Sequence, residues 1–423
     1  MKDAAGYDIS GGNARATDRL EQAFHQYRCF ADDPLGSVDS AVQLAPELVM
    51  AHALRAWLML AGADGHAVPL ARQSLHAALA LPHNEREGMH LRAISQWIEG
   101  QWRGAARTLE DLNVMYPRDA LALQVGHALD YYLGDTRMLH DRIARVLPDW
   151  SSGVPGWHLV LSMQAFGLEE NGHYNQAEKL GRQAVELEPR DAWGQHAVAH
   201  VMEMQGRRSE GIAWMVGNAG WQDSTGLGIH NWWHLALHHL ALGDTAKVLA
   251  LYDERIAKPV GAFQLELIDA SALLWRLRLQ NVDVGDRWKP VADQWAPAAG
   301  LGWCAFNDWH AAMAFIATGR DGDLFTLGQA QSQALQRNDD AGRFLREVGL
   351  AATQGVIAHG KGDYARAVDL LRPVRSASFA MGGSVAQRDL LDLTLIDAAR
   401  RSGQAALSKA LQQERDSRAV ARR

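Results

Sequence analysis

Glycines recur along this chain at intervals that alternate between two lengths. Gly100 and Gly134 are 34 residues apart, as are Gly172 and Gly206, whereas Gly62 to Gly100 and Gly134 to Gly172 are steps of 38 residues. Prolines keep the same register, 16 or 17 residues before three of these glycines, at Pro46, Pro117 and Pro189. Periods of this size indicate supersecondary units that bury their apolar faces by stacking on one another. The spacing therefore predicts an array of helical hairpins.

The clearest unit covers residues 172–191 and resembles a tetratricopeptide repeat. Gly172 and Tyr174 stand where two helices would cross closely, small alanines let the second helix approach, and Pro189 ends it. Residues 362–373 repeat this pattern. We expect an all-α, tetratricopeptide-like solenoid with a right-handed superhelix, formed by hairpins from about residue 14 to 415 in a single domain spanning residues 1–423. Residues 1–13 and 416–423 are expected to be flexible ends, and Gly-rich loops are expected at 151–156, 217–228, 283–286 and 296–302.

Composition excludes several classes of function. The 42 Lys and Arg residues against 49 Asp and Glu give a net charge of −7, which argues against nucleic-acid binding. Cys29 and Cys304 lack CxxC spacing, so neither a disulfide framework nor a thiolate zinc site is predicted, and a reducing compartment is favoured. Because no apolar run reaches about 18 residues and the N-terminus is polar, we expect a cytoplasmic protein without membrane contact.

Two histidine-rich segments follow each other closely between residues 191 and 244. On a helix, side chains spaced by three, four, seven or eight residues share one face. Each segment presents three ligand-capable side chains at such spacing: His196, His200 and Glu203 in the first, and His230, His234 and His238 in the second. This pattern favours either a metal site for iron, zinc or manganese, or acid–base catalysis by histidine.

The residues of this region resemble a known family. Residues 196–207, 211–215, 230–237 and 268–277 are similar to blocks of the tetratricopeptide repeat protein 38 family and its bacterial relatives. The resemblance covers most of the chain and is strongest from about residue 190 to 320. It implies an α-helical repeat fold. It carries no settled activity, so no catalytic role follows from it.

The hairpin register predicts that polar side chains converge on one concave pocket. His90 and His196 each lie ten residues before the glycine that ends their helix, and Glu203 lies three before Gly206. His200 or His234 would act as the acid–base group or metal ligand, supported by Glu203, and Asp269 would orient a histidine. The predicted walls also include His196, Asn231, His238, Asp308 and His310, with Trp193, Trp232 and Trp233 holding a substrate.

Three functions remain open at this level. A small organic molecule is the favoured ligand, bound for metal-assisted or metal-free histidine chemistry. The alternative is a non-catalytic scaffold that binds a peptide or protein partner, as helical-repeat grooves commonly do. The other histidines are expected to be structural, either in the core or at helix ends: His25, His66, His76, His83, His140, His158, His173, His239 and His359.

Overall fold

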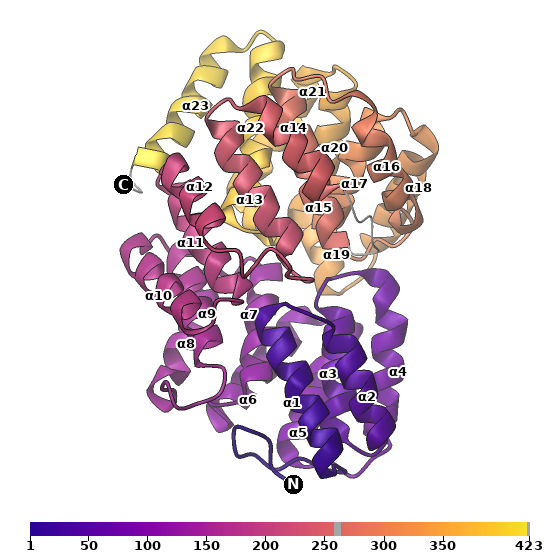
Figure 1. Ribbon diagram of the computed structural model, residues 1–423. Helices are drawn as coiled ribbons and strands as arrows, with labels where there is room; N and C mark the ends of the chain where they lie inside the picture. Colours follow the sequence, from indigo (N-terminus) through magenta and orange to yellow (C-terminus); the bar gives the residue numbers. More distant parts are fainter. Residues whose placement is uncertain (258–263, 421–423) are drawn as a thin grey trace. The chain divides into compact units, whose positions relative to one another are not determined.

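The computed structural model describes residues 1–257 and 264–420, and it is helical throughout (Figure 1). The first helix begins at Ala14 and the last ends at Val420, close to the predicted limits of 14 and 415. Within the described residues there is no β-strand, and the pairing of Lys2 with Asp8 is an isolated bridge. The all-α prediction is confirmed. None of the described helices combines the length and the apolar character needed to cross a membrane.

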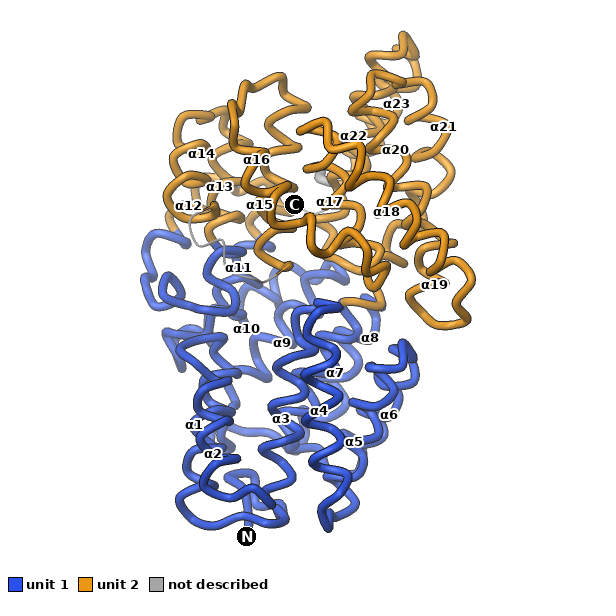
Figure 2. Tube along the Cα trace, turned by 90° about the vertical axis from the view of Figure 1, so that its right-hand side faces the viewer, with its two compact units in different colours: residues 1–131, 135–201, 214–231 blue, residues 132–134, 202–213, 232–423 orange. Residues whose placement is uncertain are grey.

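The chain divides into two compact units, which Figure 2 distinguishes by colour. Unit 1 comprises residues 1–131, 135–201 and 214–231, and unit 2 comprises residues 132–134, 202–213 and 232–423. The helices of unit 1 are α1 (Ala14–Cys29), α2 (Pro34–Leu44), α3 (Val49–Leu60), α4 (Val68–Leu79), α5 (Glu85–Ile98), α6 (Trp102–Met115), α7 (Ala120–Tyr132), α8 (Thr136–Val146), α9 (Trp157–Glu170) and α10 (Tyr174–Leu187). The prediction of a single domain stays a prediction.

Unit 2 continues the pattern of paired helices. Its helices are α14 (Thr245–Leu251), α15 (Gln264–Leu279), α16 (Trp288–Trp295), α17 (Ala305–Ala317), α18 (Asp321–Ala334), α19 (Asp340–Phe344), α20 (Leu350–Gly360), α21 (Tyr364–Val374), α22 (Val385–Arg401) and α23 (Ala405–Val420). Four helices contribute residues to both units: α7, whose last residue Tyr132 belongs to unit 2, α11 (Ala192–Met204), α12 (Arg208–Gly217) and α13 (Gly228–Ala241). Residues 1–13 belong to unit 1 and are held to its helices, for example by the hydrogen bond from Ser10 N–H to Glu87, and residues 421–423 lie outside the described residues.

Glycines end the first helix of most hairpins, as the spacing predicts. Each adopts a left-handed backbone, which glycine reaches without the steric cost of a Cβ; they are Gly100, Gly134, Gly172, Gly206, Gly243, Gly319 and Gly362. Gly62 departs from this pattern, because the left-handed residue after α3 is Ala63, with φ of 48°. The hairpin α3–α4 therefore turns one residue later than the sequence predicts.

Prolines mark the end of the second helix in three hairpins. The helices α2, α6 and α10 end at Leu44, Met115 and Leu187, two residues before a proline in each case. Pro373 was expected to end its helix in the same way, but it lies inside α21, which continues for one more residue to Val374. A short 3₁₀ turn from Arg375 to Met381 follows directly.

Each of two hairpin junctions in unit 1 contains an aspartate that caps the next helix and also binds a histidine. Asp119 accepts a hydrogen bond from the Ala122 N–H (2.9 Å) at the start of α7, and Asp191 accepts one from the Gly194 N–H (2.8 Å) at the start of α11. Each aspartate also binds a histidine of the preceding hairpin, His90 at 3.0 Å or His158 at 2.8 Å. These buried pairs tie each hairpin to the next.

Candidate metal centre

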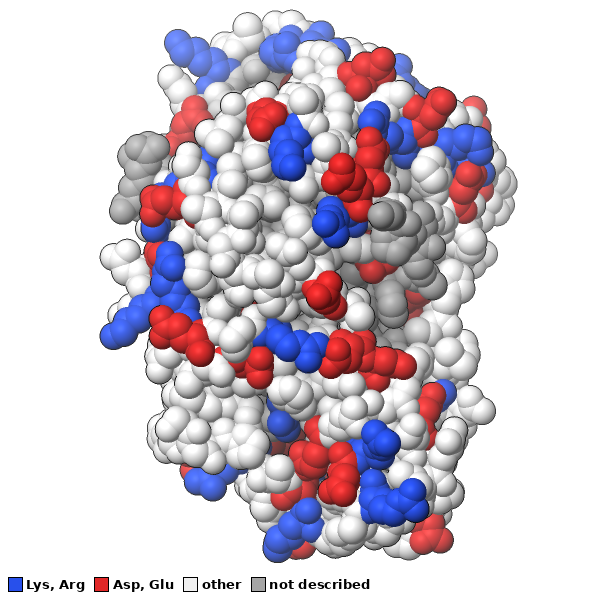
Figure 3. All heavy atoms as spheres, in the orientation of Figure 1, with Lys and Arg blue, Asp and Glu red and all other residues white. Residues whose placement is uncertain are grey.

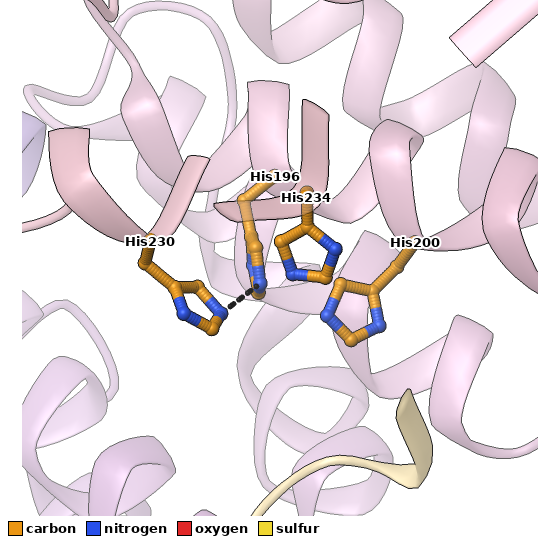
Figure 4. A group of neighbouring side chains, drawn as sticks. All are labelled: His196, His200, His230 and His234. Carbon is orange, nitrogen blue, oxygen red and sulfur yellow. Dashed lines mark hydrogen bonds between the residues drawn. The ribbon is translucent and has the colours of Figure 1, made fainter. Parts of the chain in front are cut away.

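Helices α11 and α13 bring four histidines together (Figure 4). One ring nitrogen of each of His196, His200, His230 and His234 lies within 4.8 Å of the others. His196 Nε2 and His230 Nε2 are 3.1 Å apart, and the ring centroids of His196 and His200 are 4.4 Å apart. His196, His200 and His230 belong to unit 1, and His234 follows His230 by one turn on α13. The predicted i, i+4 pairs on these two helices thus supply four of the six expected ligands.

Two glutamates contact the outer nitrogens of this four-histidine cluster. Glu203 Oε2 lies 2.9 Å from His234 Nδ1, so the ring donates its Nδ1–H to the carboxylate. Glu169 Oε2, on α9, lies 3.4 Å from His200 Nδ1, and both of these side chains are buried. Glu169 was not among the site residues predicted from the sequence. A signal was present, because Glu169 precedes Gly172 by three residues, as Glu203 precedes Gly206.

Aromatic rings form the wall beside the cluster in unit 1. The Trp193 ring lies 4.8 Å from that of His196, and the Phe166 ring lies 5.4 Å from those of both His196 and His200. Phe30 stacks on Trp193 with a centroid distance of 5.8 Å. Trp193 therefore lies beside the cluster, and its predicted role in holding a substrate stays a prediction.

The turn that carries Phe30 is held by the Gly-rich loop at residues 217–228. Phe30 has a φ of 54°, an uncommon conformation for a residue with a Cβ. Its carbonyl oxygen accepts hydrogen bonds from Ser224 Oγ (2.6 Å) and Gly226 N–H (3.0 Å). The predicted loop therefore supports the aromatic wall from outside.

Other predicted residues of α13 have different neighbours. The group of ligand atoms within 4.8 Å, searched among the described residues, includes neither Glu203 nor His238. His238 is buried against Gly211 of α12, where a Cβ would come within 2.4 Å of its ring. Arg255 covers the ring of Trp232 at 4.8 Å, and Asn231 Nδ2 donates to the carbonyl oxygen of Ala192 at 3.2 Å. These contacts favour packing roles.

Trp233 lies next to the cluster but is itself fully buried. Its ring centroid is 4.8 Å from that of His234, and the guanidinium of Arg276 lies 5.8 Å from the same ring. These contacts are those of a packed side chain beside His234, and the predicted contact of Trp233 with a substrate stays a prediction.

His310, Asp308 and Asp269 are buried in unit 2. His310 Nδ1 lies 2.8 Å from the Phe306 carbonyl oxygen of its own helix, and burial lowers the pKa of this imidazole to about 4. Asp308 accepts a hydrogen bond from Gln331 (3.3 Å), and burial raises its pKa to about 7. Neither these residues nor Asp269 belongs to a group of metal-ligating atoms in the described chain.

Unit 2 contains two cavities that border Glu203. The smaller has a volume of about 340 Å³ and the larger about 500 Å³, and both are lined by Glu203, Arg208, Asp389 and Arg415. The glutamate that binds His234 therefore faces space large enough for a small molecule. The smaller cavity is lined by five arginines and three acidic residues: Arg208, Arg375, Arg388, Arg415 and Arg418 with Glu203, Asp389 and Asp392.

The surface shows no patch in which side chains of one charge predominate, on the face drawn in Figure 3. On the face shown in Figure 3, basic and acidic side chains are interspersed.

The fold and the site define an all-helical protein with a cluster of four histidines, three of them buried, and two supporting glutamates. No family model matches the chain.

Proposed function

We propose that the chain is a tetratricopeptide-like protein of the family it resembles, and that its histidine cluster binds a divalent transition-metal ion for chemistry on a small organic anion. The observation that carries the proposal is the approach of four ring nitrogens within 4.8 Å of one another. Imidazole is a suitable ligand for zinc and iron, and helical scaffolds build such centres from facing helices. The repeated glycine register supports the repeat assignment.

The residues fit a metal ion in two respects. Two nitrogens that bind one tetrahedral zinc ion at about 2.0–2.1 Å are about 3.3 Å apart, close to the 3.1 Å between His196 Nε2 and His230 Nε2. Glu203 binds His234 through Nδ1 and Glu169 approaches Nδ1 of His200. Carboxylates in this position orient metal-ligating imidazoles and raise their basicity. Both rings can then present Nε2 to the ion.

A bound divalent ion would supply a Lewis acid that polarises a carbonyl or phosphoryl oxygen. The protein's own groups would do the rest. Glu203 holds the Nδ1 proton of His234 and borders both cavities, so it is placed to exchange a proton with a molecule bound there. The rings of Trp193 and Phe166 pack against His196 and would exclude water from it.

The cavities in unit 2 favour a negatively charged substrate. Arginines outnumber acidic side chains in the lining of both, and guanidinium groups recognise carboxylate and phosphate oxygens through paired hydrogen bonds. A volume of 340–500 Å³ suits a metabolite-sized anion.

Metal analysis of the purified chain tests this proposal. We expect the wild-type chain, equilibrated with zinc or iron(II), to retain about one more ion than the double variant His196→Ala/His230→Ala. The matched control is His66→Ala, which removes a half-exposed imidazole outside the cluster and should leave the metal content unchanged. Equal metal content in the double variant and the wild type would refute the proposed centre.

A peptide-binding scaffold is the second candidate, because the same arginines could bind the terminal carboxylate of a peptide. Calorimetric titration separates the two. A small dicarboxylate that binds with metal-dependent affinity supports the enzyme-like site. Binding of extended acidic peptides that does not change with metal supports the scaffold. In either case a cytoplasmic location is part of the proposal.

A further inference from the structure

A second group of metal-ligating side chains lies in unit 1 and shares no residue with the four-histidine cluster. His25 and Cys29 are one turn apart on α1, and His158 is the second residue of α9. One ligand atom of each, the Cys29 Sγ and a ring nitrogen of each histidine, lies within 4.8 Å of the other two. From the sequence, both histidines were expected to be structural, and no thiolate zinc site was predicted because Cys29 and Cys304 lack CxxC spacing.

The contact of His158 with Asp191 has the form expected around a metal ligand. His158 Nδ1 lies 2.8 Å from Asp191 Oδ2, and the aspartate is fully buried. The same carboxylate caps α11 through the Gly194 N–H, so its position is fixed by the backbone. A carboxylate that receives the Nδ1 proton leaves Nε2 free as a ligand and holds the ring in one orientation.

We propose that Cys29, His25 and His158 bind a zinc ion, with Asp191 orienting His158. A thiolate with two imidazoles is a ligand set that zinc accepts, and three protein ligands leave a fourth position for water or another group. Cys29 is buried and His25 is exposed, so an ion could reach the thiol from solvent at the edge of α1. Binding replaces the thiol proton, which passes to solvent.

Small side-chain movements would complete the geometry. Sulfur and nitrogen ligands of a tetrahedral zinc ion lie about 3.3–3.7 Å apart when the bonds are about 2.0–2.3 Å. The three ligand atoms are within 4.8 Å of one another, and the exposed His25 side chain can rotate to close the remaining gap. The proposal is independent of the four-histidine cluster, which contains no sulfur ligand.

Cobalt(II) is the probe that distinguishes the two sites. A cobalt ion bound to a thiolate gives a sulfur-to-metal charge-transfer band in the near ultraviolet, which histidine ligands do not produce. Under reducing conditions, we expect the full chain titrated with cobalt(II) to develop this band. The band should persist in His196→Ala/His230→Ala, even if the cluster proves unable to bind metal. It should disappear in Cys29→Ser.

The chain offers matched controls. Cys304 is a buried cysteine in unit 2 that belongs to no metal-ligating group in the described residues, so Cys304→Ser should keep the band. His25 is exposed, so His25→Ala should fold normally and bind cobalt roughly tenfold or more weakly. A wild-type chain without the band, or a band that survives in Cys29→Ser, would overturn the proposal.

Discussion

His90 and His196 occupy the same register position in their hairpins but have different partners. Each lies ten residues before the glycine that ends its helix, and each is buried. Both ring nitrogens of His90 are engaged, because Trp57 Nε1 donates to Nδ1 at 3.2 Å and Asp119 Oδ2 lies 3.0 Å from Nε2. His196 Nε2 instead faces the ring nitrogen of another histidine, His230, at 3.1 Å.

The two positions differ in the chemistry of the group that the imidazole faces. At the His90 junction, the partner is a carboxylate that also binds Arg86 at 2.9 Å, so opposite charges neutralise one another. At the His196 junction, the partner is a second base, and two bases that face each other can share a proton or a cation. The identity of the residue near the start of the next hairpin decides between the two.

The largest expected effect on stability is at the junction where Asp119 binds His90 and Arg86. Asp119→Ala should lower the free energy of unfolding by about 3–5 kcal/mol, because it leaves the buried Arg86 and His90 without their shared carboxylate. Burial opposes ionisation of Asp119, but His90 and Arg86 outweigh it and hold its pKa below the usual range. Denaturant unfolding at neutral pH measures the loss. The exposed Asp149→Ala is the control, and a similar small change in both variants would contradict the assignment.

The next prediction compares how substitutions at His230 and His90 change zinc affinity and the free energy of unfolding. His230→Ala should weaken zinc binding by roughly 10–100-fold while changing the free energy of unfolding by less than about 1 kcal/mol, because His230 is only partly buried. His90→Ala should do the reverse, losing stability and keeping zinc. Calorimetric titration and denaturant unfolding of both variants test the pair. If both variants lose stability and neither loses zinc affinity, the four-histidine cluster has only a packing role.

A third test uses His127, whose ring contacts both Phe166 and Trp193 behind the cluster. Burial, assisted by the nearby Arg142, lowers the pKa of His127 to about 3. In the unfolded chain the pKa of a histidine is about 6.5. Between pH 3 and pH 6.5, the unfolded state therefore binds a proton at His127 that the folded state lacks. Stability should therefore fall as pH decreases from about 6.5 towards 3, by up to about 1.4 kcal/mol per pH unit.

The variant His127→Leu should remove about one proton from this pH dependence. Unfolding free energies measured between pH 4.5 and 7 give the slope directly. His173→Leu, at an exposed position, should keep the wild-type slope. An unchanged slope in His127→Leu would show that the ring is protonated in the folded protein.

The smallest expected effect on stability concerns the glycines at the turns between paired helices. Gly172 has a φ of +81°, so Gly172→Ala should cost about 1–2 kcal/mol, although no atom would obstruct the new Cβ. Gly62 lacks the left-handed backbone and also has open space, so Gly62→Ala should stabilise the chain by about 0.4–1 kcal/mol. Melting temperatures of the two variants should shift in opposite directions. Equal changes in melting temperature would contradict the assignment of a left-handed backbone to Gly172 and not to Gly62.

Much of the fold could be predicted because glycine and proline report backbone conformation directly. Left-handed turns at positions such as Gly172 and Gly206 follow from the absence of a Cβ. Ala63 carries no such signal, because a residue with a Cβ rarely adopts a left-handed backbone. The π-helical turns at Tyr252–Ile256 and Leu345–Gly349 were likewise not predicted, since one additional residue in a helical turn leaves no compositional mark.

The candidate site was predictable where its residues share a helix. The pairs His196–His200 and His230–His234 follow from i, i+4 spacing alone. Contacts between helices could not be read in this way, so Trp232 was assigned to the pocket although Arg255 covers its ring. Cys29 and His158 are 129 positions apart in the chain, and only the packing of α1 against α9 brings them together.

The turn at Phe30 has a consequence for how unit 1 folds. Its carbonyl oxygen is bound by Ser224, which is 194 residues away along the chain, and its ring covers Trp193. Contacts of such large sequence separation form late, because the entropy of closing the intervening loop must first be offset by other contacts. During refolding, the Trp193 indole should therefore remain in contact with water after the individual hairpins have formed. Its fluorescence would report the final step of assembly rather than the first.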